Sequence, residues 1–535
     1  MSSKTQEYDE DAAPPVAVAD SGDTGEGGKI KMIVQLVKKC LGVKDIASMR
    51  MSLPASLLEP VPNLEYSHFL DRPDLFAAIN ESEDPFERML AVLRFYFAKD
   101  LKFVHGKVCK PYNSVLGEHF RAHWDIIPLS HPEELIERPS LQHERHSSST
   151  SVQSGSYKST LSVNTTDSDS VKPGQAPSTA PTSPEPRFSS DNNGPSRIRV
   201  VYLTEQVSHH PPVSAYYASC PARQIEMQGI DQISAKVSGT ALRIQAGQYN
   251  QGIYVGIKGG PGEGELYHIT HPVASVNGIL RGNFYLTMSD STVVSCTNDR
   301  PSSKQGGFPR FRAIVEYKEE SWLGRAHFLI EGVIFVVHEG ETEHEAWTKV
   351  KQVPQNRVAA VLDGSWKGHI RWKRVGALSY PHTTSSSASS PNPSHVQLPK
   401  PSIPSAAASR ADVTTTSEGW QTLIDVNELH AVPKEVRPID NQHPFESRRL
   451  WRNVTDNLLN KEYSDATKEK VAIEQKQRDD AAERKKKGVE FIPTFFEKGL
   501  ENGFSELTAE GRKAVEEELA EPSPFCIEGG VGKPN

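Results

Sequence analysis

The chain has 535 residues, of which 36% are hydrophobic, and a formal net charge of −8. This length allows two to four ordinary domains or one large domain with insertions. The acidic balance argues against a general nucleic-acid-binding protein, because affinity for a phosphate backbone needs an excess of Lys and Arg. The five cysteines are scattered and lack metal-binding spacing, so they predict neither a disulfide framework nor a zinc site.

The N-terminal region predicts a tail followed by a basic helix. Residues 1–28 are acidic and lack the features of a secretory signal, so we expect a disordered tail. Residues 29–43, KIKMIVQLVKKCLGV, place apolar side chains at helical spacing among lysines. This amphipathic helix could pack on a core, touch a membrane or cover a cavity. No stretch approaches the roughly 20 apolar residues that cross a bilayer, so we expect a soluble protein whose membrane contacts are peripheral.

A second helix is predicted over residues 84–97, DPFERMLAVLRFYF. Asp84 can cap this helix and Pro85 suits its first turn. Its apolar residues recur on one face, which we assign to the core. Further along, residues 139–196 and 376–418 are rich in Ser, Pro and other small or polar residues. Such segments cannot offset their ordering entropy, and we expect two disordered insertions.

Short alternating runs dominate residues 197–373. They are RIRVVYL, TALRIQA, GIYVGIK, NFYLTM, STVVSC, FRAIVEY, HFLIEGVIFVV and HIRWK. So many strands in one stretch predict an antiparallel sheet that must close or be covered, since exposed edges aggregate. A barrel is the simplest solution, and a large barrel has an interior able to hold a ligand. The expected fold class is therefore α+β.

Two helices are predicted near the C-terminus. The first is the run HPFESRRLWRNVTDNLL, which begins at residue 443. The second covers residues 464–488 and is polar almost all round, so charge pairs and a thin packing seam must hold it. Ser464 is a suitable N-cap for this helix and Gly488 a suitable stop.

The segment LTEQVSHHPP, residues 203–212, contains the adjacent histidines His209 and His210. Neighbours on an extended chain point to opposite faces and no third ligand is evident, which argues against a metal site. Acid–base catalysis lacks a partner nucleophile or a paired carboxylate. Two readings stay open from the residues alone. The pair is either structural or binds an anion, with two imidazoles donating to phosphate oxygens while Pro211 and Pro212 stiffen the turn.

The segment EQVSHHPP, residues 205–212, is the signature of the oxysterol-binding protein-related family, which the chain resembles over roughly residues 40–500. KPYNSVLGEHF (110–120) is similar to the family's second motif, and HPFESRRLW (443–451) is also similar to family members. The resemblance implies a large, nearly complete antiparallel β-barrel that encloses a lipid tunnel, with a lid over about residues 29–58, an N-terminal helical part and a C-terminal helical part. The lipid-binding domain would then span residues 29–500, with 501–535 as an extension.

The resemblance also implies a binding site for the headgroup of phosphatidylinositol 4-phosphate. The matching residues are Lys110, Asn113, His209, His210, Lys470, Glu474 and Arg478. The last three are spaced four apart and so share one helix face. Three cations against one carboxylate give a local charge of about +2 in an acidic protein, which favours an anion.

From these features we expect a lipid-transfer protein rather than an enzyme, without cofactor, metal or nucleic-acid partner. It would exchange phosphatidylinositol 4-phosphate for a second lipid, a sterol or phosphatidylserine, between membranes. Its place would be the cytoplasm, peripheral at organelle membranes or membrane contact sites, with transient binding to anionic surfaces. Two alternatives stay open: a lipid-dependent sensor or scaffold without net transport, and a hydrolase that uses His209 or His210.

Overall fold

The computed structural model describes residues 16–17, 26–47, 51–106, 109–129, 196–279, 284–298, 310–320, 326–338, 340–375 and 419–528. Apart from a few residues, the predicted acidic tail and the two predicted insertions lie outside the described residues. Of the described helices, none combines the length and the apolar character that crossing a membrane requires.

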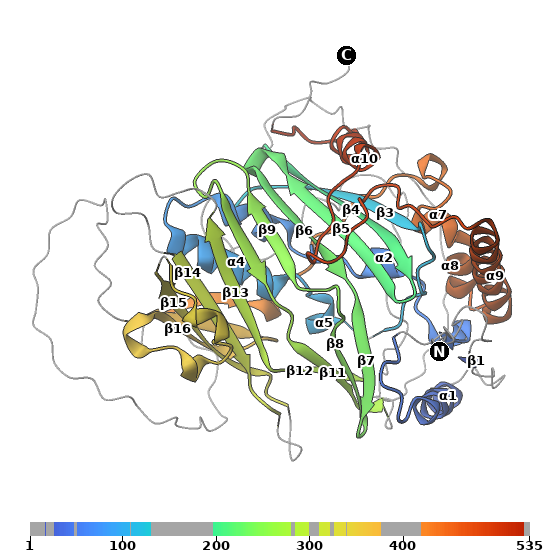
Figure 1. Ribbon diagram of the computed structural model, residues 1–535, viewed down its shortest axis with the longest axis horizontal. Coiled ribbons are helices and arrows are strands. Elements are labelled where there is room, and N and C mark those ends of the chain that lie inside the picture. The colour runs from blue at the N-terminus through green and yellow to red at the C-terminus, as the bar shows by residue number, and fades with distance from the viewer. Residues whose placement is uncertain are drawn as a thin grey trace, which may run out of the picture.

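The elements follow one another as helices at both ends with strands between them (Figure 1). The helices are α1 (Glu26–Lys39), α2 (Asn63–Tyr66), α3 (Pro73–Ala77), α4 (Pro85–Ala98), α5 (Lys102–His105), α7 (Ser447–Leu450), α8 (Arg452–Leu459), α9 (Tyr463–Lys487) and α10 (Ala509–Leu519). The strands are β1 (Val16–Ala17), β2 (Met51–Ser52), β3 (His119–Ile126), β4 (Ile198–His209), β5 (Pro212–Cys220), β6 (Ile225–Asp231), β7 (Ile233–Ser238), β8 (Ala241–Ala246), β9 (Ile253–Ile257), β10 (Glu265–Ile269), β11 (Val273–Asn277), β12 (Tyr285–Ser289), β13 (Ser291–Asn298), β14 (Arg310–Tyr317), β15 (Leu329–Val337), β16 (Val358–Ser365), β17 (His369–Arg374) and β18 (Trp420–Asp425).

One large antiparallel sheet dominates the fold. It has twelve strands in the order β18-β17-β16-β15-β14-β13-β10-β9-β6-β5-β4-β3, and a second sheet has the order β12-β11-β8-β7. All eight predicted runs are strands. In the described part of the chain, β3 and β18 are edges that pair with one neighbour each. The barrel is thus nearly complete rather than closed, and the predicted α+β class is confirmed.

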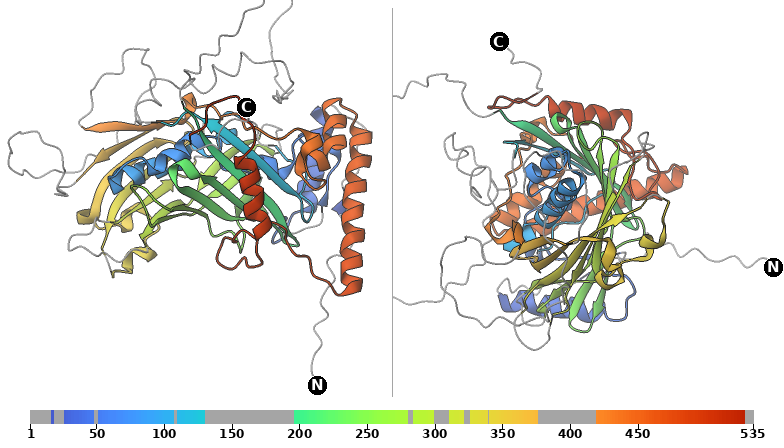
Figure 2. Two further views of the ribbon diagram at one scale, coloured as in Figure 1. Left: turned by 90° about the horizontal axis from the view of Figure 1, so that it is seen from above. Right: turned by 90° about the vertical axis from the view of Figure 1, so that its left-hand side faces the viewer.

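Helix α4 lies inside the curve of the large sheet (Figure 2). The ring of Phe86 packs 5.4 Å from that of Phe311 and 5.5 Å from that of Trp372, which lie on β14 and β17. Asp84 caps the helix as predicted, because its carboxylate accepts the N–H of Phe86 at 2.8 Å. The predicted core helix therefore occupies the concave side of the sheet, and the main hydrophobic cluster forms around it.

The C-terminal part of the chain covers the outside of the sheet and one of its ends. Helix α10, which lies beyond the predicted domain limit at 500, packs on β4 through Ala514 and Val515. The predicted helix that begins at residue 443 is two short helices, α7 and α8, which meet at the buried Trp451. Together with α9 they stand at one end of the barrel (Figure 2).

Helix α9 matches its predicted end but not its predicted start. It begins at Tyr463, with Glu462 in the cap position, so the prediction of Ser464 as the N-cap is wrong by two residues. It ends at Gly488, whose φ of +62° is the left-handed conformation that favours glycine.

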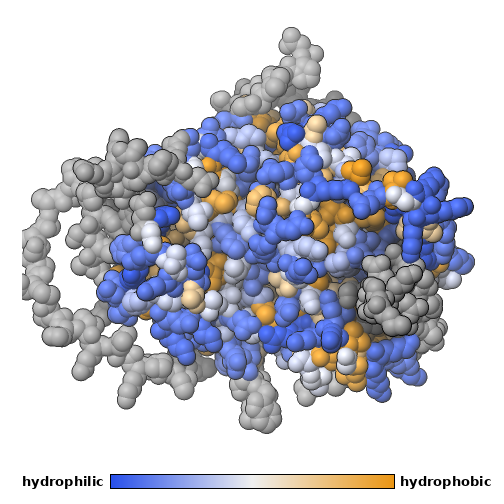
Figure 3. Space-filling view, in the orientation of Figure 1, coloured by the Kyte–Doolittle hydropathy of each residue, from blue (hydrophilic) through white to orange (hydrophobic). Residues whose placement is uncertain are grey.

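Helix α1 lies beside the smaller sheet. Its Ile33 and Val37 pack against the main core cluster. Directly after it, the N–H of Ile46 donates to the carbonyl of Ala235 on β7 at 2.6 Å, and the carboxylate of Asp45 accepts the N–H of Ala235 at 2.8 Å. Hydrophobic groups gather at the surface near α1 and the chain that follows it (Figure 3).

Candidate functional site

The two adjacent histidines lie at the tip of the hairpin formed by β4 and β5. The last pair of this hairpin joins His209 to Pro212. The imidazole rings of His209 and His210 are 4.5 Å apart between centroids and inclined by 67°. Strand β3 pairs with β4 only as far as Glu205, so the histidines stand beyond the end of the edge strand.

The motif at residues 110–120 lies beside this end of β4. The N–H of Gly117 donates to the carbonyl of Gln206 at 2.9 Å, and the N–H of Gln206 donates back to the carbonyl of Glu118 at 2.8 Å. Gly117 has a φ of +80°, and a Cβ there would lie 3.4 Å from the ring of Phe491. The turn therefore needs glycine. The chain that follows it enters β3 and runs along β4 away from the histidines.

The buried carboxylate of Glu118 joins this motif to the chain around α7. It accepts hydrogen bonds from the N–H of Val115 at 3.0 Å, the hydroxyl of Ser447 at 2.7 Å and the indole of Trp451 at 3.0 Å. Burial raises the pKa of Glu118 to about 7, although these three donors act in the opposite direction. Glu118 is thus a structural junction between two motifs that are far apart in sequence.

Glu205 likewise joins the signature motif to a distant part of the chain. Its carboxylate accepts the backbone N–H groups of Thr494 and Phe495, each at 2.8 Å, and burial raises its pKa to about 6. The sequence analysis included both glutamates in the motifs but did not predict that they connect distant parts of the chain. The available signal was a carboxylate within or next to a strand of the sheet, which must find donors when it is buried.

Lys110 and Asn113 contact each other within the turn of their motif. The amine of Lys110 donates to the side-chain oxygen of Asn113 at 2.6 Å and to the carbonyl of Pro111 at 3.0 Å. Lys110 keeps accessible surface, yet protein crowds its amine. This desolvation, together with the positive charge of Lys470, lowers the pKa of Lys110 to about 8.

Helix α9 supplies the second cation. The amine of Lys470, whose residue is 4% exposed, donates to the carboxylate of Glu474 at 2.7 Å. Arg478 is directed differently, because its guanidinium donates to the side-chain oxygen of Gln475 at 3.1 and 2.8 Å. Two of the three predicted α9 residues therefore form a pair, and the effect of Lys470 on Lys110 places that pair next to the second motif.

This arrangement suits binding of an anion. Lys110 and Lys470, from separate elements, lie close enough for their charges to interact. The side-chain amide of Asn113 and the two imidazoles at the hairpin tip belong to the same end of the barrel. Residues that could hold a metal ion, His119, His443 and Glu446, form a separate group on the outer face.

The comparisons with known proteins agree with these motifs. A family model described as oxysterol-binding protein matches residues 32–517. Oxysterol-binding protein-like protein 1 of Schizosaccharomyces pombe is 36% identical, with 95% of each chain covered. Oxysterol-binding protein homolog 6 of Saccharomyces cerevisiae is 22% identical over 90% of this chain and 77% of its own length.

Two solved structures share the fold. The Osh1 ORD domain in complex with cholesterol gives a TM-score of 0.53 at 18% identity, with 93% of this chain and 90% of that chain covered. The Osh3 ORD of Saccharomyces cerevisiae in complex with PI(4)P gives a TM-score of 0.51 at 14% identity, with 91% and 93% covered.

Proposed function

The chain belongs to the oxysterol-binding protein family, and on this premise we propose that it is a lipid-transfer protein that binds phosphatidylinositol 4-phosphate and a second lipid in one barrel. Members of this family are lipid-binding and transfer proteins rather than enzymes. The protein takes up the two lipids one at a time and exchanges them between membranes.

The observation that carries the proposal is the proximity of Lys110 and Lys470. Two like charges close together, one of them with its pKa lowered to about 8, are unfavourable until an anion lies between them. A phosphomonoester brings up to two negative charges and several acceptor oxygens. Each charge-assisted hydrogen bond to it contributes roughly 1.5 to 3 kcal/mol.

The remaining predicted residues complete the headgroup site in this proposal. Asn113 donates its amide to the phosphate or the inositol ring, and His209 and His210 donate from the hairpin tip. Glu474 orients Lys470 through their 2.7 Å contact. Arg478 must leave Gln475 to reach the ligand.

The lipid tails need a dry compartment closed by a lid. Removing acyl chains from a bilayer costs about 0.8 kcal/mol for each methylene, so a two-tailed lipid leaves only for an equally apolar interior. We assign the lid to residues 29–58, which include most of α1. The packing of Ile33 and Val37 against the main core supports this assignment, and Lys38 and Lys39 favour contact with anionic membrane surfaces.

The second lipid is a sterol or phosphatidylserine. The structures of Osh1 with cholesterol and with ergosterol and of Osh3 with PI(4)P support a sterol and the phosphoinositide as candidates. We place the protein in the cytoplasm, peripheral at organelle membranes or membrane contact sites.

A transfer assay between liposomes tests the proposal. Donor liposomes carry labelled phosphatidylinositol 4-phosphate, and acceptor liposomes carry sterol, phosphatidylserine or neither. We expect wild-type protein to move the label, and the better counter-lipid identifies the second cargo. The variant His209→Ala/His210→Ala should lose transfer, while the matched control His338→Ala/His369→Ala, which removes two exposed histidines elsewhere, should retain it.

Other outcomes separate the alternatives. Binding of the phosphoinositide without net transfer supports a sensor or scaffold. Release of inorganic phosphate or fatty acid supports a hydrolase. Equal transfer by the histidine variant and wild type would contradict the headgroup assignment.

A further inference from the structure

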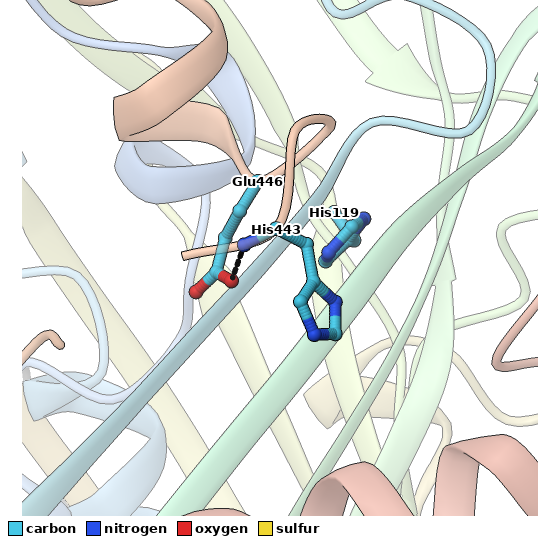
Figure 4. A group of neighbouring side chains, drawn as sticks. All are labelled: His119, His443 and Glu446. Carbon is cyan, nitrogen blue, oxygen red and sulfur yellow. Dashed lines mark hydrogen bonds between the residues drawn. The ribbon is translucent and has the colours of Figure 1, made fainter. Parts of the chain in front are cut away.

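A group of three side chains lies on the outer face of the barrel, where β3 begins opposite Glu205. His119 begins the edge strand β3, and His443 and Glu446 belong to the turn before α7 (Figure 4). One ligand atom from each of the three residues lies within 4.8 Å of the other two. The neighbours of His119 along β3, Phe120 and Ala122, face the core, so His119 faces outward.

The ring of His119 is held so that one nitrogen keeps its lone pair. Nδ1 lies 3.3 Å from the carbonyl oxygen of Gly117. A carbonyl oxygen only accepts, so Nδ1 donates and, in the neutral ring, Nε2 is the acceptor. Among the described residues Nε2 has no hydrogen-bond partner, although His119 is only 5% exposed. A hydrogen bond of this kind from the other ring nitrogen is typical of histidines that bind metals.

Glu446 offers one oxygen in the same way. Its Oε2 accepts from the guanidinium of Arg121 at 2.9 Å and from the backbone N–H of His443 at 3.1 Å. Its Oε1 has no partner in the described part of the chain, and the residue is 1% exposed. Buried carboxylate oxygens normally have a partner, so this oxygen calls for one.

His443 supplies the third group and leaves access from solvent. It is exposed, and its ring centroid lies 5.6 Å from that of His119. Metal–nitrogen distances of about 2.1 Å in tetrahedral geometry place ligand atoms roughly 3.4 Å apart, so a small rotation of the exposed His443 side chain completes the set. The open fourth position is left for water.

The charges around the group permit a cation. Arg121 lies nearest, but its guanidinium contacts two carboxylates, Glu446 and, at 3.1 Å, Glu517. Two neutral imidazoles and one carboxylate are ligands that suit first-row divalent metals, zinc in particular.

We propose that His119, His443 and Glu446 bind one divalent transition metal ion, zinc in the first instance. The ion fastens the edge strand β3 to the turn that leads into α7. This proposal departs from the expectation of no metal site, since the ligands come from distant parts of the sequence and have no recognisable spacing. The proposed metal site does not rest on the proposed lipid binding.

Cobalt titration of the full chain tests the proposal. The protein is stripped with a chelator, dialysed and titrated with Co²⁺, whose visible absorption is strong in tetrahedral sites, and Zn²⁺ is then added in competition. We expect one equivalent to bind with tetrahedral absorption that zinc abolishes. His443→Ala should weaken binding at least tenfold and keep the fold, because His443 is exposed, and the matched control His338→Ala should bind as wild type does.

Three outcomes overturn the proposal. They are absence of tetrahedral absorption, equal affinity of His443→Ala and wild type, and loss of binding in His209→Ala/His210→Ala instead, which would place the ion at the hairpin. His119→Gln provides a second test of the same site, with circular dichroism to confirm folding.

Discussion

The acidic and the basic residues of the sequence motifs behave in opposite ways. Glu118 and Glu205 are buried, and their carboxylates are surrounded by donors from distant parts of the chain. Lys110 and Lys470 instead lie near each other, and their mutual repulsion helps to lower the pKa of Lys110. One short motif therefore contains both scaffold residues and residues that we propose to bind the ligand, and we expect substitutions in these two classes to have different effects.

The largest expected effect belongs to the scaffold. Glu118→Ala leaves the indole N–H of Trp451 and the N–H of Val115 buried without an acceptor, so we expect a loss of about 2 to 4 kcal/mol in the free energy of unfolding. Urea denaturation followed by tryptophan fluorescence measures it.

Glu118→Gln is the matched control. Its amide oxygen can still accept from Trp451 and its amide nitrogen can donate to the Ser447 hydroxyl, so we expect a change below about 1 kcal/mol. Unchanged stability of Glu118→Ala, combined with lost lipid binding, would instead place Glu118 among the ligand-binding residues.

The next largest effect belongs to the cations. Lys110→Gln should weaken binding of phosphatidylinositol 4-phosphate about 10- to 100-fold, the equivalent of one charge-assisted hydrogen bond. The melting temperature of the ligand-free protein should stay the same or rise, because a crowded positive charge is removed. If Lys110→Gln lowered both the affinity and the stability, Lys110 would behave like the scaffold residues, and the distinction between scaffold and binding residues would be wrong.

The third prediction concerns pH. Since the pKa of Lys110 is lowered to about 8, its charge is present at pH 7 and largely lost at pH 9, and the affinity for the phosphoinositide should fall up to about tenfold over this interval. The unfolded chain binds this proton up to about pH 10.4, so the same group increases the stability of the empty protein as the pH rises above 8. Equilibrium binding to liposomes at several pH values measures the effect, and Lys110→Gln should flatten it.

The smallest expected effect is that of Arg478. Its guanidinium is already bound to Gln475, so part of any contact with the ligand is offset by the contact it gives up. We expect Arg478→Ala to weaken binding about threefold. The control is Lys468→Ala on the same helix, which removes an exposed ion pair with Asp465. A loss as large as that of Lys110→Gln would show that Arg478 reorients fully.

The sequence predicted the local elements well because their signals are local. Alternation identified eight strands, and Asp84 and Gly488 marked the ends of their helices. The sequence analysis did not predict other strands, such as β6 and β10, nor the break between α7 and α8 at Trp451. At that break the indole of Trp451 donates to the carboxylate of Glu118, a contact between residues that are distant in sequence.

The site could be predicted only through the resemblance. Lys110 and Lys470 belong to different elements, and nothing in their local sequence indicates that they meet. The same holds for His119 and His443. The sequence of a polar helix such as α9 is typical of a solvent-exposed helix, and only the packing shows that Lys470 is buried.

The pairings of β3 with β4 and of β17 with β18 indicate where the length of the chain can vary. Ile126 faces Ile198 across this pair, and Lys373 likewise faces Trp420 on β17 and β18. The described residues at the two ends of each long segment therefore lie at neighbouring points, about 5 Å apart. On β4 that point is the end opposite the histidines. At such positions we expect that the chain can be lengthened, shortened or fused to a reporter without changing the proposed headgroup site.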